Sequence, residues 1–306
     1  MILTYAAFVV LGLIWGSNFI YMKWAAALTS PEQIVLLRIF FGFLPLASAA
    51  WHKGVINRSQ ARHLPHFLVM AVVATAFYYF AIVKGTALLP SGIAGVLGGS
   101  IALFTAIFSL LLLRTEKLNG LMAVGVVLGF AGIALIARPW EGTANPINRA
   151  GVVWMLTGSI ILGLSYVYVR RFLAPLNLPP LALATWQVGL ALLILLLLTN
   201  FTGIGQILQD WRAAMGVVVG LGILGTGTAF LIYYFLIYYF LLQELGAVAA
   251  SGATYITPTV ALLIGWAAGE KVGIFEVAAV VLILASIAML QIGRQRAGRE
   301  RLRAGK

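Results

Sequence analysis

Ten apolar stretches follow one another along the chain, and short segments with charges, prolines and glycines separate them. A helix needs about 20 mainly apolar residues to cross the hydrocarbon core of a bilayer. The pattern therefore predicts a bundle of membrane-spanning helices joined by short linkers. We place the helices at residues 3–23, 32–51, 66–86, 92–113, 118–137, 150–170, 179–200, 213–242, 247–268 and 273–293.

The composition supports this interpretation. Of the 306 residues, 62% are hydrophobic and 9% are charged, and the mean hydropathy is +1.03. Soluble domains carry about 25% charged residues, and a folded protein must present a large surface to water. These values exclude a water-soluble enzyme, a disordered chain and a fibrous repeat, and they predict an all-α integral membrane protein. The chain has no cysteine, which excludes disulfides and thiolate metal sites.

The charge is strongly basic, with 20 Lys and Arg against 8 Asp and Glu. In so apolar a chain, anionic lipid headgroups explain this excess better than nucleic acid does. If the N-terminus is cytoplasmic, the inner segments hold 13 basic residues and the outer segments 6. We therefore expect both termini inside a bacterial inner membrane. The basic tail at 294–306 is interpreted as a lipid-facing anchor. The start lacks a basic region before its apolar core, so we expect a retained first span rather than a signal peptide.

The two halves of the chain resemble each other. The segment from Ile14 to Lys23 matches the segment from Ile161 to Arg170, and Glu116–Lys117 matches Glu270–Lys271 at an offset of 154. At a constant offset of 147, the halves share Gly16 with Gly163, Tyr21 with Tyr168, Lys23 with Arg170, and Gly42 with Gly189.

These matches divide the chain into a first repeat of five helices, residues 1–143, and a second, residues 144–293, before the tail. Because five is odd, the second repeat must enter the membrane upside down. Inverted repeats place a substrate site near the midplane between the halves, and their rocking gives alternating access. A duplication that survives only as scaffold, a channel and a membrane enzyme are the alternatives.

Three motifs are similar to those of a known family. They are LIWGSNFIYMKWA at 13–25, LLRIFFGFLPL at 36–46, and GEK at 269–271 after ITPTVALLIGWAA. With these motifs the chain resembles the EamA-type branch of the drug/metabolite transporter superfamily over nearly all of residues 3–293. The resemblance implies a ten-helix inner-membrane exporter of small metabolites, including amino acids in some members, and it fixes no substrate.

Ionisable groups inside the spans are few, and no Asp, Glu or His lies at a midplane. A proton relay normally needs such a group. Small multidrug transporters of the same superfamily carry a glutamate in their first helix, and this first helix has none. Antiport by that mechanism is therefore disfavoured, which leaves a facilitator or a coupling route that this pattern does not reveal.

Arg38 is the charge that its position places deepest in a span, because it lies about seven residues, or about 10 Å, into the second span. Its planar guanidinium fork could bind a substrate carboxylate. The alternative, which we favour at this stage, is that Arg38 extends to the outer interface or pairs with Glu32 or a helix end.

Aromatic and uncharged polar residues lie within the spans and suit a cavity for a small amphipathic or aromatic solute. Trp15 and Tyr79 are the strongest candidates, and interfacial belts or helix packing are the alternative. Pro258 and the glycines 98 and 99 are candidate hinge positions. The candidate cavity residues are Trp15, Asn18, Tyr78, Tyr79, Ser100, Tyr166, Trp186, Tyr238 and Tyr255.

Residues 231–240 read LIYYFLIYYF, an immediate tandem copy of five residues. The eighth span would then be about 45 Å long against a hydrocarbon core of about 30 Å. Five extra residues also turn a helix by a net angle of about 140°. We therefore expect only one of the tyrosine pairs 233/234 and 238/239 to face a cavity.

Together these features predict an alternating-access exporter of small metabolites, with neutral or aromatic amino acids favoured as substrates. Broad efflux of drugs or hydrophobic metabolites is the alternative within this class, and an enzyme acting on lipid-linked substrates is the alternative outside it. Such an enzyme would need convergent ionisable groups, which the sequence does not offer. We expect no cofactor and no metal, a small-molecule substrate and membrane lipids as partners, no nucleic acid, and a monomer or a homodimer.

Overall fold

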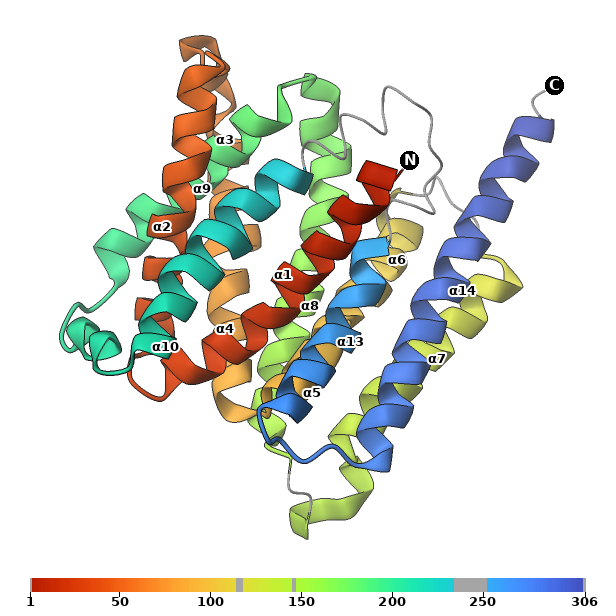
Figure 1. Ribbon diagram of the computed structural model, residues 1–306. Helices are drawn as coiled ribbons and strands as arrows, with labels where there is room; N and C mark the ends of the chain where they lie inside the picture. Colours follow the sequence, from red (N-terminus) through yellow and green to blue (C-terminus); the bar gives the residue numbers. More distant parts are fainter. Residues whose placement is uncertain (1, 114–117, 145–146, 234–251, 305–306) are drawn as a thin grey trace.

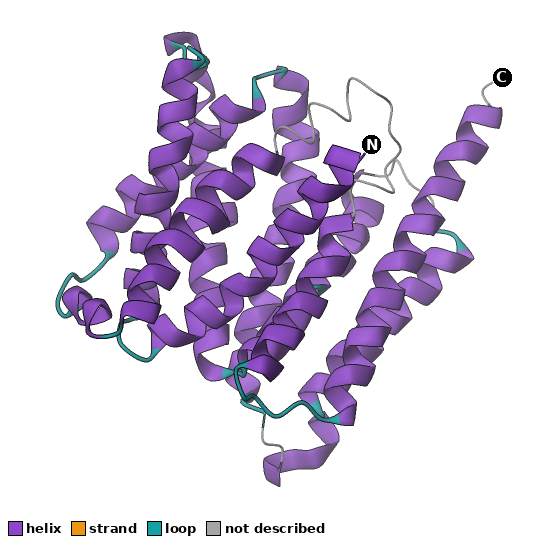
Figure 2. Cartoon of the chain, in the orientation of Figure 1, coloured by secondary structure: helices purple, strands orange, loops and turns teal. Residues whose placement is uncertain are grey.

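The computed structural model describes the chain except residues 1, 114–117, 145–146, 234–251 and 305–306. The described residues form helices and loops and contain no strand (Figure 2), which confirms the all-α prediction. The long helices are α1 (Ile2–Ala26), α2 (Pro31–His52), α3 (Leu64–Ala71), α4 (Tyr78–Leu88), α5 (Ser91–Gly98), α6 (Ser100–Phe108), α7 (Gly120–Ala137), α8 (Arg149–Tyr168), α9 (Pro180–Leu198), α13 (Gly252–Ala267) and α14 (Ile274–Ala304).

Short helical segments extend several of these helices. The π-helical segments are η2 (Val72–Phe77), η3 (Ser109–Leu113), η5 (Val169–Leu173) and η8 (Gly216–Thr228), the last of which follows α10 (Trp211–Met215). The 3-10 segments are η1 (Arg58–His63), η4 (Pro139–Ala144), η6 (Ala174–Leu176) and η7 (Ile204–Gln209).

Eight described segments are long and apolar enough to cross a membrane. The predicted first and ninth spans correspond to α1 and to α13, whose shorter apolar part is Ile256–Ala267. The count of ten spans in two repeats remains a prediction. The eight segments are Pro31–His52, Arg58–Leu88, Ser91–Leu113, Gly120–Glu141, Arg149–Leu176, Pro180–Leu198, Trp211–Tyr233 and Ile274–Ala297.

Two spans differ in detail from their predicted form. The fourth is interrupted at Gly99, where α5 ends and α6 begins. The eighth begins at Trp211 and is helical through Tyr233, with a long π-helical part in its middle. The second copy of the tandem repeat lies outside the described residues, so the prediction about its two tyrosine pairs stays open.

Helices of the two predicted halves are interleaved (Figure 1). Helix α1 packs against α13, and α6 packs against α8. A second pair of contacts joins α2 to η8 and α3 to α9. A third pair joins α4 to α8 and α1 to η8. In each of these three pairs, replacing both helices by their counterparts in the other predicted half turns one contact into the other. Helices α7 and α14, the last of each half, pack against each other.

A duplicated glycine explains the first of these paired contacts. A methyl group on Gly16 would lie 2.6 Å from Val260 of α13, and one on Gly163 would lie 2.9 Å from the backbone nitrogen of Thr105 in α6. Small residues let membrane helices approach closely. The match at offset 147 therefore corresponds to two close helix crossings, one from each half.

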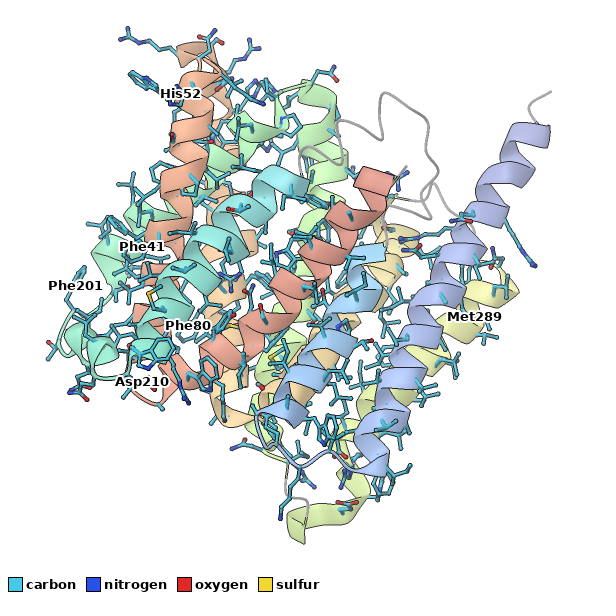
Figure 3. The ribbon with its side chains drawn as sticks, in the orientation of Figure 1. Phe41, His52, Phe80, Phe201, Asp210 and Met289 are labelled. Carbon is cyan, nitrogen blue, oxygen red and sulfur yellow. The ribbon has the colours of Figure 1, made fainter. Side chains whose placement is uncertain are left out.

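The ends of the bundle differ in which chain segments they hold. Helix α1 begins and α14 ends at the same end (Figure 1). His52, at the end of α2, lies at that end, and Asp210 lies at the opposite one (Figure 3). The predicted tail does not leave the last span as a loop, because α14 continues through it to Ala304. Which end faces the cytoplasm remains a prediction.

Candidate functional site

Arg38 lies inside the bundle, on α2. Only 3% of its surface is exposed. Its Nε donates to Thr226 Oγ1 at 3.0 Å, and one terminal nitrogen donates to the Gly225 carbonyl at 3.5 Å. The other terminal nitrogen lies 4.0 Å from the sulfur of Met22. The expectation that Arg38 extends to the interface or pairs with Glu32 is therefore wrong, because neighbouring helices enclose it and supply its acceptors.

An aromatic ring and an amide complete the surroundings of the guanidinium. Its central carbon lies 3.8 Å from the centre of the Tyr79 ring, a cation–π contact. The Tyr78 ring lies 4.9 Å from that of Tyr79. The Asn18 amide fits its surroundings when its oxygen accepts from Arg38 at 3.2 Å and its nitrogen donates to the Ile14 carbonyl at 3.1 Å. We call Arg38, Asn18, Met22, Tyr79 and Thr226 the Arg38 centre.

The Arg38 centre holds a cation without a counter-ion from the described part of the chain. Both ion pairs there involve a different arginine, Arg138. A guanidinium carries five N–H donors. The neutral acceptors around Arg38 engage its Nε and one terminal nitrogen, while the other terminal nitrogen has only a weak thioether contact. At least one donor is therefore left for a further acceptor.

The local sequence explains why a bulky side chain fits here. Residues 216–228 are rich in glycine; Gly222 lies against Phe41 and the Arg38 backbone carbonyl, and Gly225 lies against Asn18. A methyl group on Gly225 would lie 2.5 Å from the end of the Asn18 amide. Thr226 is fully buried, and its hydroxyl donates to the Leu221 carbonyl at 3.0 Å while accepting from Arg38. π-helical turns are frequent at functional sites, and this one presents Thr226 to the cation.

Some of the other predicted cavity residues lie elsewhere in the interior. Trp15 is on α1, one turn before Asn18, and its ring lies 6.1 Å from that of Tyr233. Ser100 is buried and donates to the Leu97 carbonyl at 2.6 Å, so its hydroxyl is already occupied by its own helix.

The predicted hinge residues meet at the interruption between α5 and α6. A methyl group on Gly99 would lie 3.0 Å from the Pro258 ring, and one on Gly98 would lie 3.0 Å from Phe19. The two elements singled out from the sequence, one from each half, are therefore neighbours.

Other predicted residues are not brought to the Arg38 centre. Trp186 stacks on Phe67 with ring centres 5.8 Å apart and donates to Gln60 Oε1 at 2.9 Å, near the start of the third span. Tyr166 is 42% exposed on α8. Tyr238 and the side chain of Tyr255 lie outside the described residues.

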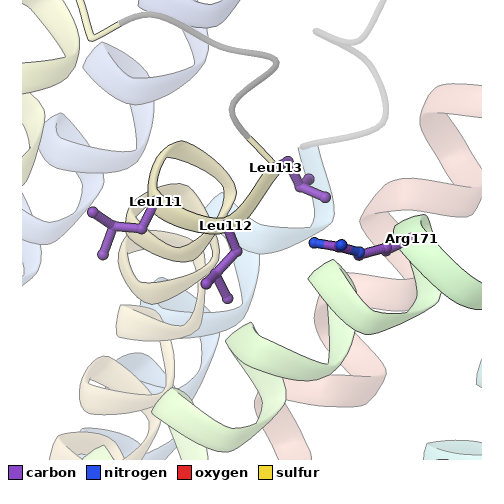
Figure 4. A pocket seen from close by; sticks show the side chains of 4 residues that line it. All are labelled: Leu111, Leu112, Leu113 and Arg171. Atoms are coloured by element: carbon purple, nitrogen blue, oxygen red, sulfur yellow. The ribbon is translucent and has the colours of Figure 1, made fainter.

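A cavity of about 570 Å³ opens at the ends of η3 and η5. Leu111, Leu112 and Leu113 form one wall, and Arg171 reaches toward them from the second half (Figure 4). Because Ser91 and Leu113 are the two ends of one candidate span, this cavity lies at the end of the bundle opposite to the start of α5.

Sequence reasoning missed Thr226 and Met22. Met22 is four residues after Asn18, so the two share a face of α1, and that spacing was a usable signal. Thr226 is 188 residues from Arg38, and only its position in a glycine-rich stretch could have drawn attention to it. In the described part of the chain, no three His, Asp or Glu side chains are grouped so that they could hold a metal ion.

An all-helical bundle of membrane-length apolar helices, with a cation buried between its halves, has the form of a membrane transporter. The comparisons agree: the EamA-like transporter family matches residues 2–138 and again residues 149–292. The chain belongs to this family, as the sequence motifs implied.

Named relatives are also transporters. The uncharacterized transporter YoaV of Bacillus subtilis is 23% identical over 83% of this chain and 84% of its own. The uncharacterized inner membrane transporter YedA of Escherichia coli is 28% identical over 67% of this chain and 63% of its own. A solved crystal structure shares the fold, with a TM-score of 0.61 at 19% identity and coverage of 96% of this chain and 97% of that one.

Proposed function

We propose that this transporter exports small metabolites that carry a carboxylate, with neutral or aromatic amino acids as the favoured class. The observation that carries the proposal is the buried guanidinium of Arg38, which has only neutral partners and at least one N–H donor left for a further acceptor. An ionisable residue within the membrane is costly and usually serves function. A substrate carboxylate would supply the missing counter-ion through the bidentate geometry that guanidinium favours.

The surroundings of Arg38 also suit the rest of such a substrate. The rings of Tyr78 and Tyr79 offer an apolar wall, and the Asn18 amide can exchange its present partners for an ammonium or amide group. The thioether of Met22 is a flexible neighbour that a carboxylate could displace. A solute held here would touch both halves, because Thr226 belongs to the second.

Alternating access by two inverted repeats is the mechanism we propose. Two observations support it: the helix contacts occur in pairs related by exchange of the two predicted halves, and the family model matches the chain twice, once in each half. The centre is buried from solvent, so a solute would reach it only after the helices around it separate. We place both termini in the cytoplasm of a bacterial inner membrane, on the bias of basic residues. The hinge role of Gly98, Gly99 and Pro258 belongs to the same proposal.

Efflux of uncharged or cationic hydrophobic compounds is the second candidate. The aromatic residues favour it, while an uncompensated cation opposes a cationic substrate through like-charge repulsion.

The test compares a solute with its analogue that lacks the carboxylate. Purified protein in vesicles loaded with unlabelled phenylalanine is given radiolabelled phenylalanine or radiolabelled phenethylamine, alongside protein-free vesicles. We expect saturable exchange of the amino acid and no exchange of the amine.

Three results would change the proposal. Equal exchange of the amine would favour hydrophobic efflux. Exchange that a pH gradient drives would keep the carrier and add proton coupling. No exchange of any carboxylate in a panel of amino acids, by folded protein, would refute the proposed substrate class.

A further inference from the structure

Glu270 connects the two halves at the end of the bundle opposite the cavity. It follows α13, and its carboxylate lies over the beginning of α5. One oxygen accepts from the Ser91 N–H at 2.6 Å and the other from the Gly92 N–H at 2.9 Å. The first N–H groups of a helix have no partner within the helix, and a carboxylate there also benefits from the helix dipole.

The chain is shaped to deliver Glu270 to this place. Gly269 has a φ of +88°, a left-handed conformation that glycine adopts without strain. The turn lets the Glu270 N–H donate to the Gly265 carbonyl at 2.9 Å, so the chain folds back along α13. A methyl group on Gly265 would lie 2.4 Å from a carboxylate oxygen of Glu270 and 2.9 Å from the Gly92 nitrogen. The carboxylate therefore fits because Gly265 has no side chain.

A lysine strengthens the connection. Lys23, at the end of α1, donates to the Ala87 carbonyl in the last turn of α4 at 3.0 Å, and it is close enough to attract Glu270. These contacts join α1, α4 and α5 of the first half to the turn after α13 of the second. Lys23 is the charged group that faces Glu270. Lys271, which follows Glu270 in the chain, is exposed, and the described residues of α5 and α13 carry no charge.

The connection is closed while the far end of the bundle is hollow. Leu113 lies at the other end of the span that begins at Ser91, and the cavity is there. An alternating-access transporter needs, at each end, a closure that can be released. A closure made by an ionised carboxylate can be released by a proton, because protonation removes its charge and turns an acceptor oxygen into a hydroxyl.

We propose that Glu270 is a proton-binding site whose ionised form holds this end of the transporter closed. The proton comes from solvent, which reaches the half-buried side chain, and binds one carboxylate oxygen. The N–H of Ser91 or Gly92 then loses its acceptor, the attraction to Lys23 is lost, and α5 separates from the turn after α13. The inference rests on the proposed alternating access and supplies the coupling route that the spans lack. On the bias of basic residues, this end faces outward.

Site-directed labelling tests the proposal without any substrate. The chain has no native cysteine, so Ser91→Cys provides a single reporter. Ser91 is fully buried and its hydroxyl has no hydrogen-bond partner, so the thiol replaces no contact. Labelling with a membrane-impermeant maleimide is measured in right-side-out and inside-out vesicles. The maleimide is applied at neutral or at acidic pH, and each labelling rate is divided by that of a free thiol at the same pH, so that the change in thiol reactivity cancels.

We expect acidic pH during labelling to raise the normalised labelling rate of the Ser91→Cys reporter about tenfold, the effect of losing one hydrogen bond to a charged group. Adding Glu270→Gln should give high labelling at both values of pH. Glu141→Gln, which changes a carboxylate in η4 that does not contact α5, should behave as the reporter alone. A pH response that persists in Glu270→Gln, or a variant labelled no faster than its parent at neutral pH, would overturn the proposal.

A second variant keeps the test decisive if Glu270→Gln does not fold. Gly265→Ala keeps the Glu270 carboxyl group, but the added methyl group pushes the carboxylate away from the α5 N–H groups. This variant should therefore also raise labelling at neutral pH. Gly120→Ala is the matched control, because a methyl group there meets nothing within 4 Å. Unchanged labelling in folded Gly265→Ala would count equally against the closure. Because no solute is present, these outcomes are independent of whether amino acids are transported.

Discussion

Two arginines of the first half reach the second half, and they are held in opposite ways. Arg138, after α7, pairs with Glu276 Oε1 at 2.5 Å and with Glu141 at 3.8 Å, and its guanidinium lies 4.5 Å from the Phe275 ring centre. Arg38 lies against a ring at 3.8 Å but has only neutral acceptors. Within the described chain, one cation has its counter-ions and the other does not. A compensated charge joins helices, whereas an uncompensated one is available to a solute.

The largest effect should come from removing the charge of Arg38. Arg38→Met keeps length and apolar packing, and we expect kcat/KM for exchange to fall about a thousandfold, or about 4 kcal/mol. The melting temperature in detergent should not fall, because a buried cation without a counter-ion gives way to an apolar side chain. Full exchange by Arg38→Met would show that the solute does not bind this guanidinium.

Removing the charge of Arg138 should act on stability instead. Arg138→Met leaves Glu276 largely buried without its partner, and breaking such a pair costs about 3 kcal/mol. We expect a lower melting temperature together with exchange per folded molecule near that of the parent. If Arg138→Met transported no better than Arg38→Met at equal folded protein, the contrast between the two arginines would fail.

A smaller effect should follow from the hydroxyl that positions Arg38. Thr226→Val keeps the shape but removes the acceptor of the Arg38 Nε, and we expect KM to rise about tenfold, or about 1.4 kcal/mol. Thr86→Val is the matched control, since Thr86 is equally buried and its hydroxyl donates to the Ile82 carbonyl at 2.8 Å without contacting a charge. Equal changes in both variants would mean that the effect is one of helix packing.

The smallest effect should come from the weaker partner of Arg138. Glu141 is 27% exposed and its ion pair is long, and exposed ion pairs contribute about 0–1 kcal/mol. Glu141→Gln should therefore lower the free energy of unfolding by less than about 1 kcal/mol, measured by thermal or chemical denaturation in detergent. A loss as large as that of Arg138→Met would make Glu141, rather than Glu276, the principal counter-ion.

The apolar pattern predicted the fold well because every helix that crosses a bilayer must be apolar over its whole length. Most described spans begin and end within a few residues of their predicted places, but the third begins at Arg58 rather than at 66, the sixth ends at Leu176 rather than at 170, and the last helix continues to Ala304. The wide turns of η8 could not be predicted, since a π-helix has the same composition as an α-helix. Nor could the interruption at Gly99 be distinguished from a continuous helix, although the glycines there are candidate hinge positions in the sequence.

The candidate site was predictable only in part. Arg38 is visible as a lone charge in an apolar stretch, but its burial was misjudged because its acceptors come from the eighth span. Trp186 shows the opposite difficulty. An aromatic residue in an apolar helix packs equally well in a cavity or against a neighbour, and Gln60, from a polar segment interpreted as a linker, is the partner that fixes its position. Contacts between distant segments are absent from the pattern of a single chain.

Gly16 and Gly163 have an evolutionary consequence. Each occupies the same place in its own half, and each leaves room for a helix of the other half where a methyl group would not fit. Both meet backbone as well as side-chain atoms, the Thr257 carbonyl beside Gly16 and the Thr105 nitrogen beside Gly163, and each crossing involves a different pair of helices. A gene that arose by duplication would thus have inherited two separate positions at which mutation to any larger residue is selected against.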